Sequence, residues 1–208
     1  MCVLLPVWTG GRWLEENLLS VRYCIEAMYR LGRELVVLSI DFEKAFDSVE
    51  RVALVRALKY HRCDTRLIEV VMDIYMGDTT KIWRNGKVVG DTEVTSVIRQ
   101  VCTGSPQLFV MVVNIVINSI LESKLGYRDE EFYIPVLFYA DDGLLLARSC
   151  EEAEEIRMVV EVAGECGLCI NKRKSSVLLY NCRAGKPDEV GGMKVVSSIR
   201  YLGTDVWG

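Results

Sequence analysis

The stretch Phe138-Tyr139-Ala140-Asp141-Asp142 decides how this chain folds. An apolar run at 134–137 precedes it, and Gly-Leu-Leu-Leu-Ala at 143–147 follows it. Two short apolar runs around a tight polar pair predict a β-hairpin with both acids at its tip. Adjacent carboxylates between apolar strands repel one another, and a hard divalent cation such as Mg²⁺ relieves that conflict. An isolated Asp-Asp pair is more typical of a solvated turn, so a metal site needs a third carboxylate.

A third carboxylate follows another predicted strand. Residues 35–40 (Leu-Val-Val-Leu-Ser-Ile) are almost continuously apolar and rich in β-branched side chains, which predicts a central strand that ends in Asp41. If this strand pairs beside the hairpin, Asp41, Asp141 and Asp142 converge at one edge of the sheet. Such a cluster can hold two ions roughly 3.5–4 Å apart and clamp both oxygens of a phosphoryl displacement.

Length and composition fit one globular domain with a substantial core. The chain has 208 residues, of which 50% are hydrophobic and 26% are charged. Its formal charge is −4 and its pI is near 5.2. This acidic balance argues against a basic nucleic-acid-binding module by bulk electrostatics, but it leaves room for a local basic groove.

Cysteine usage and hydropathy indicate the compartment. Eight cysteines without a secretory signal predict buried, reduced thiols in an intracellular protein. The expected compartment is the nucleus or the cytoplasm. Cys166 and Cys169 have the spacing of a zinc or redox pair, but the single His and the lack of a clear second pair argue against a metal role. The longest apolar run, 108–121, is interrupted by polar residues and too short to span a bilayer, so no membrane is expected.

Periodicity and turn signals predict the other elements. Five helices are expected. Two cover 14–31 and 107–124, and a third has an apolar stripe at 67, 70, 71, 74 and 75. The other two begin at capping boxes, one at Asp47–Glu50 that leads to about Tyr60 and one at Ser149–Glu152. A hairpin is expected around Asn85-Gly86, with strands at 79–84 and 87–97. Further strands are expected at 176–180, 194–196 and 200–202. Together these elements predict an α+β sheet that helices cover on one face.

Five stretches carry a resemblance to a known family. They are 40–48 (IDFEKAFDS), 98–109 (IRQVCTGSPQLF), 138–142 (FYADD), 167–175 (GLCINKRKS) and 201–203 (YLG). In this order they resemble motifs A, B, C, D and the start of E of the reverse transcriptases of non-LTR (LINE-like) retrotransposons. The resemblance covers residues 35–203.

The resemblance implies a right-hand polymerase palm, an antiparallel sheet covered by helices, with partial fingers and the thumb absent. Residues 1–208 would form a single reverse transcriptase domain fragment: 1–34 a fingers remnant, 35–203 the palm, and about 60–98 a fingers insertion. The implied activity is RNA-directed DNA polymerase, which transfers a nucleotide from a dNTP to a primer 3′-hydroxyl by a two-metal mechanism. An RNA template, a DNA primer and the dNTP are the implied partners. The missing thumb and fingers segments, or a partner chain, would complete the enzyme.

The resemblance also implies catalytic roles. Asp41 and Asp141 would ligate two Mg²⁺ ions, for which Mn²⁺ is a substitute, and Asp142 would support the site. Lys174 would approach the triphosphate and protonate the pyrophosphate leaving group. The alternative for Lys174 is a solvated lysine in the basic run 172–174.

Four further residues are implied to contact the incoming nucleotide. Phe46 would be the steric gate beneath the sugar, with a core aromatic as the alternative. Arg99 and Gln100 would bind the deoxynucleotide. Tyr139 would lie beside primer or nucleotide, although alternation along the strand also allows a packing role.

One departure from the family pattern bears on activity. Position 101 is Val, where motif B of the family has Gly after Arg-Gln. A β-branched side chain there resists the close backbone approach that Gly permits. This departure motivates one alternative, an inactive remnant that acts as a nucleic-acid- or protein-binding module. A separate alternative, a group II intron maturase-like enzyme, has the same chemistry as the retrotransposon enzyme.

Overall fold

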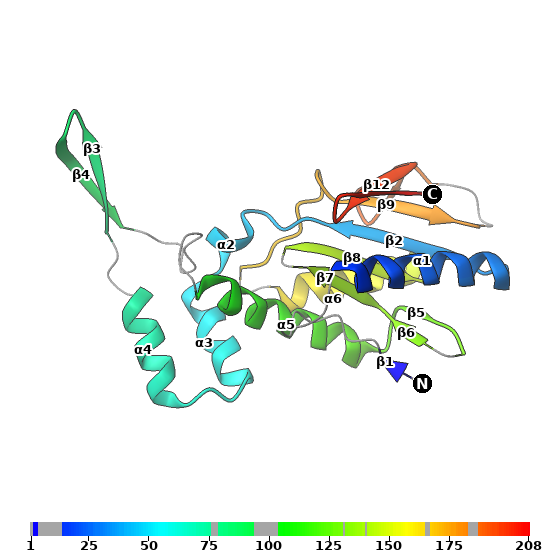
Figure 1. Cartoon of the computed structure of the whole chain (residues 1–208), viewed down its shortest axis with the longest axis horizontal. Coiled ribbons are helices and arrows are strands. Elements are labelled where there is room, and N and C mark those ends of the chain that lie inside the picture. Colours follow the sequence, from blue (N-terminus) through cyan, green and yellow to red (C-terminus); the bar gives the residue numbers. More distant parts are fainter. Residues whose placement is uncertain are drawn as a thin grey trace.

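A computed structural model describes residues 2–3, 14–75, 79–93, 104–130, 132–139, 141–164, 167–182 and 187–208 (Figure 1). At its centre is a six-stranded sheet with the order β10-β11-β9-β2-β8-β7. These strands are β2 (Leu35–Ile40), β7 (Val136–Tyr139), β8 (Asp142–Ala147), β9 (Ser176–Tyr180), β10 (Glu189–Val190) and β11 (Met193–Val195). Neighbours are antiparallel except β9 and β11, which run parallel, so the expected all-antiparallel sheet is corrected at this one pair.

Both faces of the sheet are covered. Alternate residues of β2, such as Val36 and Leu38, pack in one core with helices α3 (Arg51–Tyr60), α5 (Ser105–Ser123) and α6 (Cys150–Ala163). Leu35 and Val37 pack in a second core with α1 (Leu14–Leu31) and the hairpin β12 (Ser198–Tyr201)–β13 (Thr204–Trp207). The prediction of helices on one face only is therefore wrong. The nearly continuous apolar run of β2 is the physical reason, since a strand without a polar side must be buried on both faces.

The smaller elements complete the chain. Helices α2 (Ala45–Ser48) and α4 (Thr65–Tyr75) lie before the hairpin of β3 (Thr79–Arg84) and β4 (Lys87–Glu93). Strands β1 (Cys2–Val3), β6 (Phe132–Ile134) and β5 (Tyr127–Arg128) form a separate small sheet. The predicted bounds of α1 and β2 are confirmed, and the predicted hairpin around Asn85-Gly86 is present. The part of the second predicted strand at 94–97 lies outside the described residues.

The first predicted capping box is wrong. Asp47 lies inside α2, and Glu50 is the N-cap of α3, where it makes no side-chain capping bond. Val49 separates the two helices in an extended conformation, with its side chain 1% exposed in the core. Burial of this apolar side chain decides the break between the helices, because it outweighs the local capping preference.

Helix α4 uses a different face from the predicted one. Val71 packs toward Leu54 and Leu58 of α3, together with Ile68 and Met72. Three members of the predicted stripe are instead half or more exposed, namely Leu67, Val70 and Ile74. The apolar surface of this helix is wider than one partner covers, so periodicity alone does not select the buried side.

Helix α5 is longer than the apolar run in the sequence suggests. By length and composition its 19 residues could cross a membrane. One side, including Phe109, Val113, Val116 and Ile120, is buried in the core against the sheet and the neighbouring helices. A core helix of this kind passes the same test of length and hydropathy.

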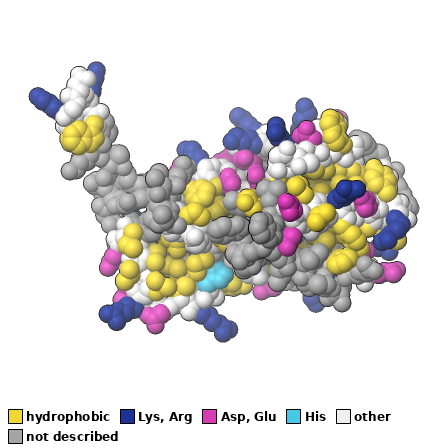
Figure 2. All heavy atoms as spheres, viewed as in Figure 1, with side chains coloured by type: hydrophobic (Ala, Val, Ile, Leu, Met, Phe, Trp, Pro, Cys, Tyr) yellow, Lys and Arg dark blue, Asp and Glu magenta, His cyan; other side chains and the backbone are white. Residues whose placement is uncertain are grey.

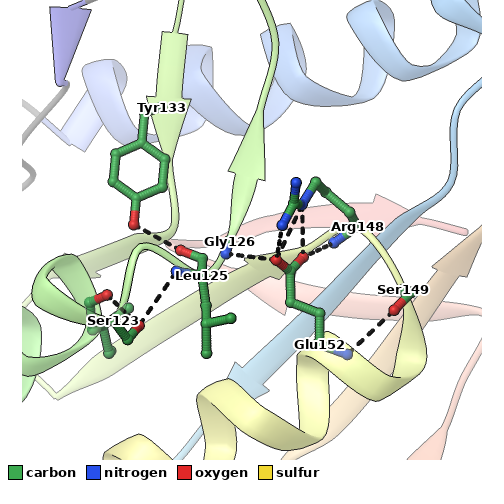
Figure 3. Close-up of polar contacts among 8 residues, drawn as sticks. Ser123, Leu125, Gly126, Tyr133, Arg148, Ser149 and Glu152 are labelled. Atoms are coloured by element: carbon green, nitrogen blue, oxygen red, sulfur yellow. Dashed lines mark hydrogen bonds and ion pairs between the residues drawn. The ribbon is translucent and has the colours of Figure 1, made fainter.

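The buried carboxylate of Glu152 ties α6 to the chain that follows α5 (Figure 3). It accepts hydrogen bonds from the backbone N–H of Gly126 at 3.2 Å and of Arg148 at 2.6 Å. The guanidinium of Arg148 also donates to it, with Nε at 3.0 Å from Oε1. Half of the second capping box is confirmed, because Ser149 Oγ accepts from Glu152 N at 3.2 Å. Burial alone would raise the pKa of Glu152, but Arg148 and the backbone donors outweigh it and lower that pKa.

Candidate active site

Strand register brings the predicted acids to one end of the sheet. In the antiparallel pair β2–β8, Ile40 lies opposite Gly143, and β7 and β8 meet at Tyr139 and Asp142. The next residues at this end are Asp41 and Asp142, on strands that lie roughly 4.7–4.9 Å apart. The predicted pairing of the central strand with the hairpin is therefore confirmed, and it joins residues about one hundred positions apart in the sequence (Figure 1).

The acids influence one another electrostatically. Partial burial raises the pKa of Asp142, and the negative charges of Asp141 and Asp41 raise it further. All three side chains retain access to solvent. Within the part of the chain that the structure describes, no three His, Cys, Asp or Glu side chains are arranged closely enough to hold an ion as they stand. The arrangement is thus a cluster of like charges that a cation would stabilise.

A loop from another part of the sequence holds Asp41 in place. The backbone N–H of Asp41 donates to Ser175 Oγ at 3.1 Å, and the N–H of Asn171 donates to the Asp41 carbonyl at 2.8 Å. Ser175 is 3% exposed, so its hydroxyl is a fixed partner. One residue further along, Phe42 bridges to Ile170. The sequence predictions do not include Ser175 as a supporting residue, although a hydroxyl directly before a buried strand is a recognisable signal.

Lys174 lies beside the same acid. Its Nζ is 4.0 Å from Asp41 Oδ1, and its side chain is 70% exposed. An exposed pair of this kind contributes only about 0–1 kcal/mol to stability. The structure therefore places a solvent-exposed positive charge at the acidic edge.

Two of the four predicted nucleotide contacts, Phe46 and Tyr139, lie among the described residues. Phe46 is half-buried and stacks against Phe109 of α5, with ring centroids 4.5 Å apart. Tyr139 is half-buried at the end of β7. Arg99, Gln100 and the departure at Val101 lie outside the described residues.

Helix α1 contacts the β7–β8 hairpin on the face of the sheet opposite to α5 and α6. The side chain of Asn17 is buried, and its Nδ2 donates to the carbonyl of Phe138 at 3.2 Å. Tyr201 of β12 is 2% exposed, and burial raises its pKa, with a further contribution from the charge of Asp142. Asn17 is likewise not among the sequence predictions, although a polar residue on the buried stripe of an amphipathic helix indicates a buried hydrogen bond.

Comparison with known proteins identifies similar sequences. The family model described as reverse transcriptase (RNA-dependent DNA polymerase) matches residues 10–206. A retrovirus-related Pol polyprotein from type-1 retrotransposable element R2 of Bradysia coprophila is 28% identical over 177 residues, covering 83% of this chain and 19% of that protein. The transposon TX1 uncharacterized 149 kDa protein of Xenopus laevis is 26% identical over 172 residues, covering 81% of this chain and 13% of that protein. The chain thus spans about a fifth or less of the length of these curated relatives.

Solved structures share the fold. Telomerase from Candida albicans, in complex with a TWJ fragment of telomeric RNA, aligns with a TM-score of 0.67 at 12% identity. The alignment covers 97% of this chain and 33% of that one. Apo telomerase from Candida tropicalis aligns with a TM-score of 0.66 at 11% identity, covering 93% of this chain and 34% of that one. Identities this low show the fold alone.

Proposed function

The chain belongs to the reverse transcriptase (RNA-dependent DNA polymerase) family, in the form found in non-LTR retrotransposons, and we propose that it joins a dNTP to the 3′-hydroxyl of a DNA primer on an RNA template. The observation that carries this proposal is the register that sets Asp41 beside Asp142 at the hairpin tip. Family membership favours this reading over that of a non-catalytic binding module.

The acidic edge suits Mg²⁺. Its donors are carboxylate oxygens, which hard divalent cations prefer. Partial burial and the neighbouring charges of Asp141 and Asp41 raise the pKa of Asp142, so a bound cation would relieve that repulsion. Asp41 and Asp141 would hold two ions, with Asp142 in support and Mn²⁺ as a substitute. When bound, such ions lower the pKa of an attacking hydroxyl and neutralise charge on the triphosphate.

Three side chains of this protein, Lys174, Phe46 and Tyr139, bind and orient the nucleotide and supply a proton. Lys174, exposed and 4.0 Å from Asp41, approaches the triphosphate and donates a proton to the departing pyrophosphate. Phe46, held against Phe109, forms the floor under the sugar and excludes a 2′-hydroxyl. Tyr139 contacts the nucleotide from the end of β7. Positioning and charge compensation supply most of the catalysis in phosphoryl transfer, so a site without a Ser or His nucleophile is sufficient.

The remaining assignments follow from the motifs. Arg99 and Gln100 contact the incoming nucleotide. Residues 35–203 form the palm, while 1–34 and about 60–98 belong to the fingers. Further grip on primer and template would come from segments outside this stretch or from a partner chain. We propose the nucleus or the cytoplasm as the compartment of the reaction.

Primer extension on poly(rA)/oligo(dT) with Mg²⁺ tests the proposal. Asp41→Asn keeps the shape of the side chain but removes its charge, and we expect extension to fall by roughly 10³-fold, as when a transition-state contact is lost. Asp188→Asn is the matched control, because it removes an equal charge from an exposed residue before β10. Undiminished extension by Asp41→Asn, or no extension by the unsubstituted chain with either Mg²⁺ or Mn²⁺, would contradict the proposal.

A further inference from the structure

The hairpin β3–β4 stands clear of the central sheet and its helices (Figure 1). Its turn is Asn85-Gly86, with φ of 51° and 74°. Positive φ at both central residues is the two-residue turn that matches the twist of a hairpin. The tip of this hairpin is therefore a tight two-residue turn rather than a long loop.

The side chains at the tip differ in charge from the rest of the chain. Positions 83–89, on either side of the turn, contain two basic residues and no acidic one, in a chain whose net charge is −4. Arg84 lies opposite Lys87, and both are exposed beside the turn. Figure 2 shows basic side chains gathered at the tip of the projecting hairpin. A local positive potential on an acidic protein points to a negatively charged ligand.

An aromatic ring is exposed at the same place. Trp83 is 65% exposed and pairs across the hairpin with Val88, which is 46% exposed. This cross-strand pair stabilises the hairpin but leaves much of the indole in water. Nucleic-acid bases stack on exposed aromatic rings, while nearby Arg and Lys neutralise the flanking phosphates.

We propose that Trp83, Arg84 and Lys87 form a binding site for single-stranded nucleic acid. The indole of Trp83 stacks on an unpaired base, and the two cations at the turn pair with phosphates of the same strand. A duplex fits this site poorly, because its bases are already stacked on one another. The proposal rests on the proposed function, in which an unpaired template strand must be held.

Fluorescence anisotropy of a labelled, unstructured 20-nucleotide RNA tests the site on the full chain. Trp83→Ala should weaken binding roughly 5- to 100-fold, the range for loss of one stacked base, and Trp83→Phe should restore most of it. Arg84→Gln with Lys87→Gln should lower the slope of log affinity against log salt by about 1.4, for two lost phosphate contacts on a single strand. Trp207→Ala, at an exposed aromatic of β13, and Lys59→Gln with Lys194→Gln are the matched controls and should bind as the unsubstituted chain does.

Three results would overturn the proposal: binding of Trp83→Ala within twofold of the unsubstituted chain, an unchanged salt slope in the Arg84 and Lys87 double variant, or a loss of blunt-duplex binding in Trp83→Ala as large as its loss of RNA binding. Asp41→Asn separates this proposal from the polymerase one. It should bind the RNA normally while failing to extend a primer. Hairpin-dependent binding without extension by the unsubstituted chain would count against polymerase activity alone, and extension without hairpin-dependent binding would count against this site alone.

Discussion

Replacement of Glu152 offers a test of the fold that does not depend on catalysis. Glu152 is 7% exposed and accepts from the backbone of both Gly126 and Arg148 (Figure 3). Glu152→Ala leaves the buried Gly126 N–H without an acceptor, which lowers the free energy of unfolding by about 1–3 kcal/mol. Loss of the hydrogen bond from the Arg148 N–H lowers it by about 1 kcal/mol more. The guanidinium of Arg148 adds only about 0–1 kcal/mol, because it is 56% exposed and water replaces the carboxylate.

We therefore expect Glu152→Ala to lower the free energy of unfolding by about 2–5 kcal/mol in urea titrations. For a chain of this length that corresponds to a fall in Tm of about 4–20 °C. Glu152→Gln retains one carbonyl oxygen and should cost about 1–2 kcal/mol. Arg148→Gln is the control, since it keeps the backbone donor and should cost no more than about 1 kcal/mol. A loss of unfolding free energy in Glu152→Ala no larger than that in Arg148→Gln would contradict the assigned hydrogen bonds to Gly126 and Arg148.

The same carboxylate predicts a pH dependence of stability. Its pKa in the folded chain lies below the usual value of about 4.3 for Glu in an unfolded chain. Its contribution to stability is therefore present above pH 4–5 and is lost as the pH falls through the folded-state pKa. The difference in unfolding free energy between the unsubstituted chain and Glu152→Gln should be largest near pH 7 and shrink below about pH 4. A difference that grows on acidification would contradict the assigned contacts.

Two further predictions concern the proposed site. Ser175→Ala removes the acceptor for the Asp41 N–H and should lower the free energy of unfolding by about 1–3 kcal/mol. It should also lower kcat for extension by roughly 10- to 100-fold, with little change in KM for dNTP, because a contact that supports the site is lost. Ser176→Ala is its neighbouring control, and an unchanged kcat for Ser175→Ala would remove Ser175 from any positioning role. Phe46→Ala should increase ribonucleotide incorporation relative to deoxynucleotide, whereas Phe109→Leu, which loosens the same packing, should preserve sugar selectivity. Equal selectivity of Phe46→Ala and the unsubstituted chain would reject the gate.

The sequence by itself determined the elements whose pattern is strong and local. The alternating spacing of apolar residues specified α1, and the β-branched run specified β2 with Asp41 at its end. Asn85-Gly86 specified the hairpin β3–β4, because few residues tolerate its backbone angles. The pairing of β2 with the Asp-Asp hairpin was also within reach, since both are short apolar runs that end in acids.

Tertiary structure decided which faces are buried and what supports the acids. Helix α4 packs on α3 through the face that carries Val71, so Leu67 and Val70 remain exposed. Because Val49 is buried in an extended conformation, α3 begins later than the capping box predicts. Ser175 reaches Asp41 only because the chain returns beside β2 after 134 further positions. Periodicity records whether a residue prefers water or a core, a property of the local chain. The partner that it meets there depends on how distant segments pack, and no local pattern contains that information.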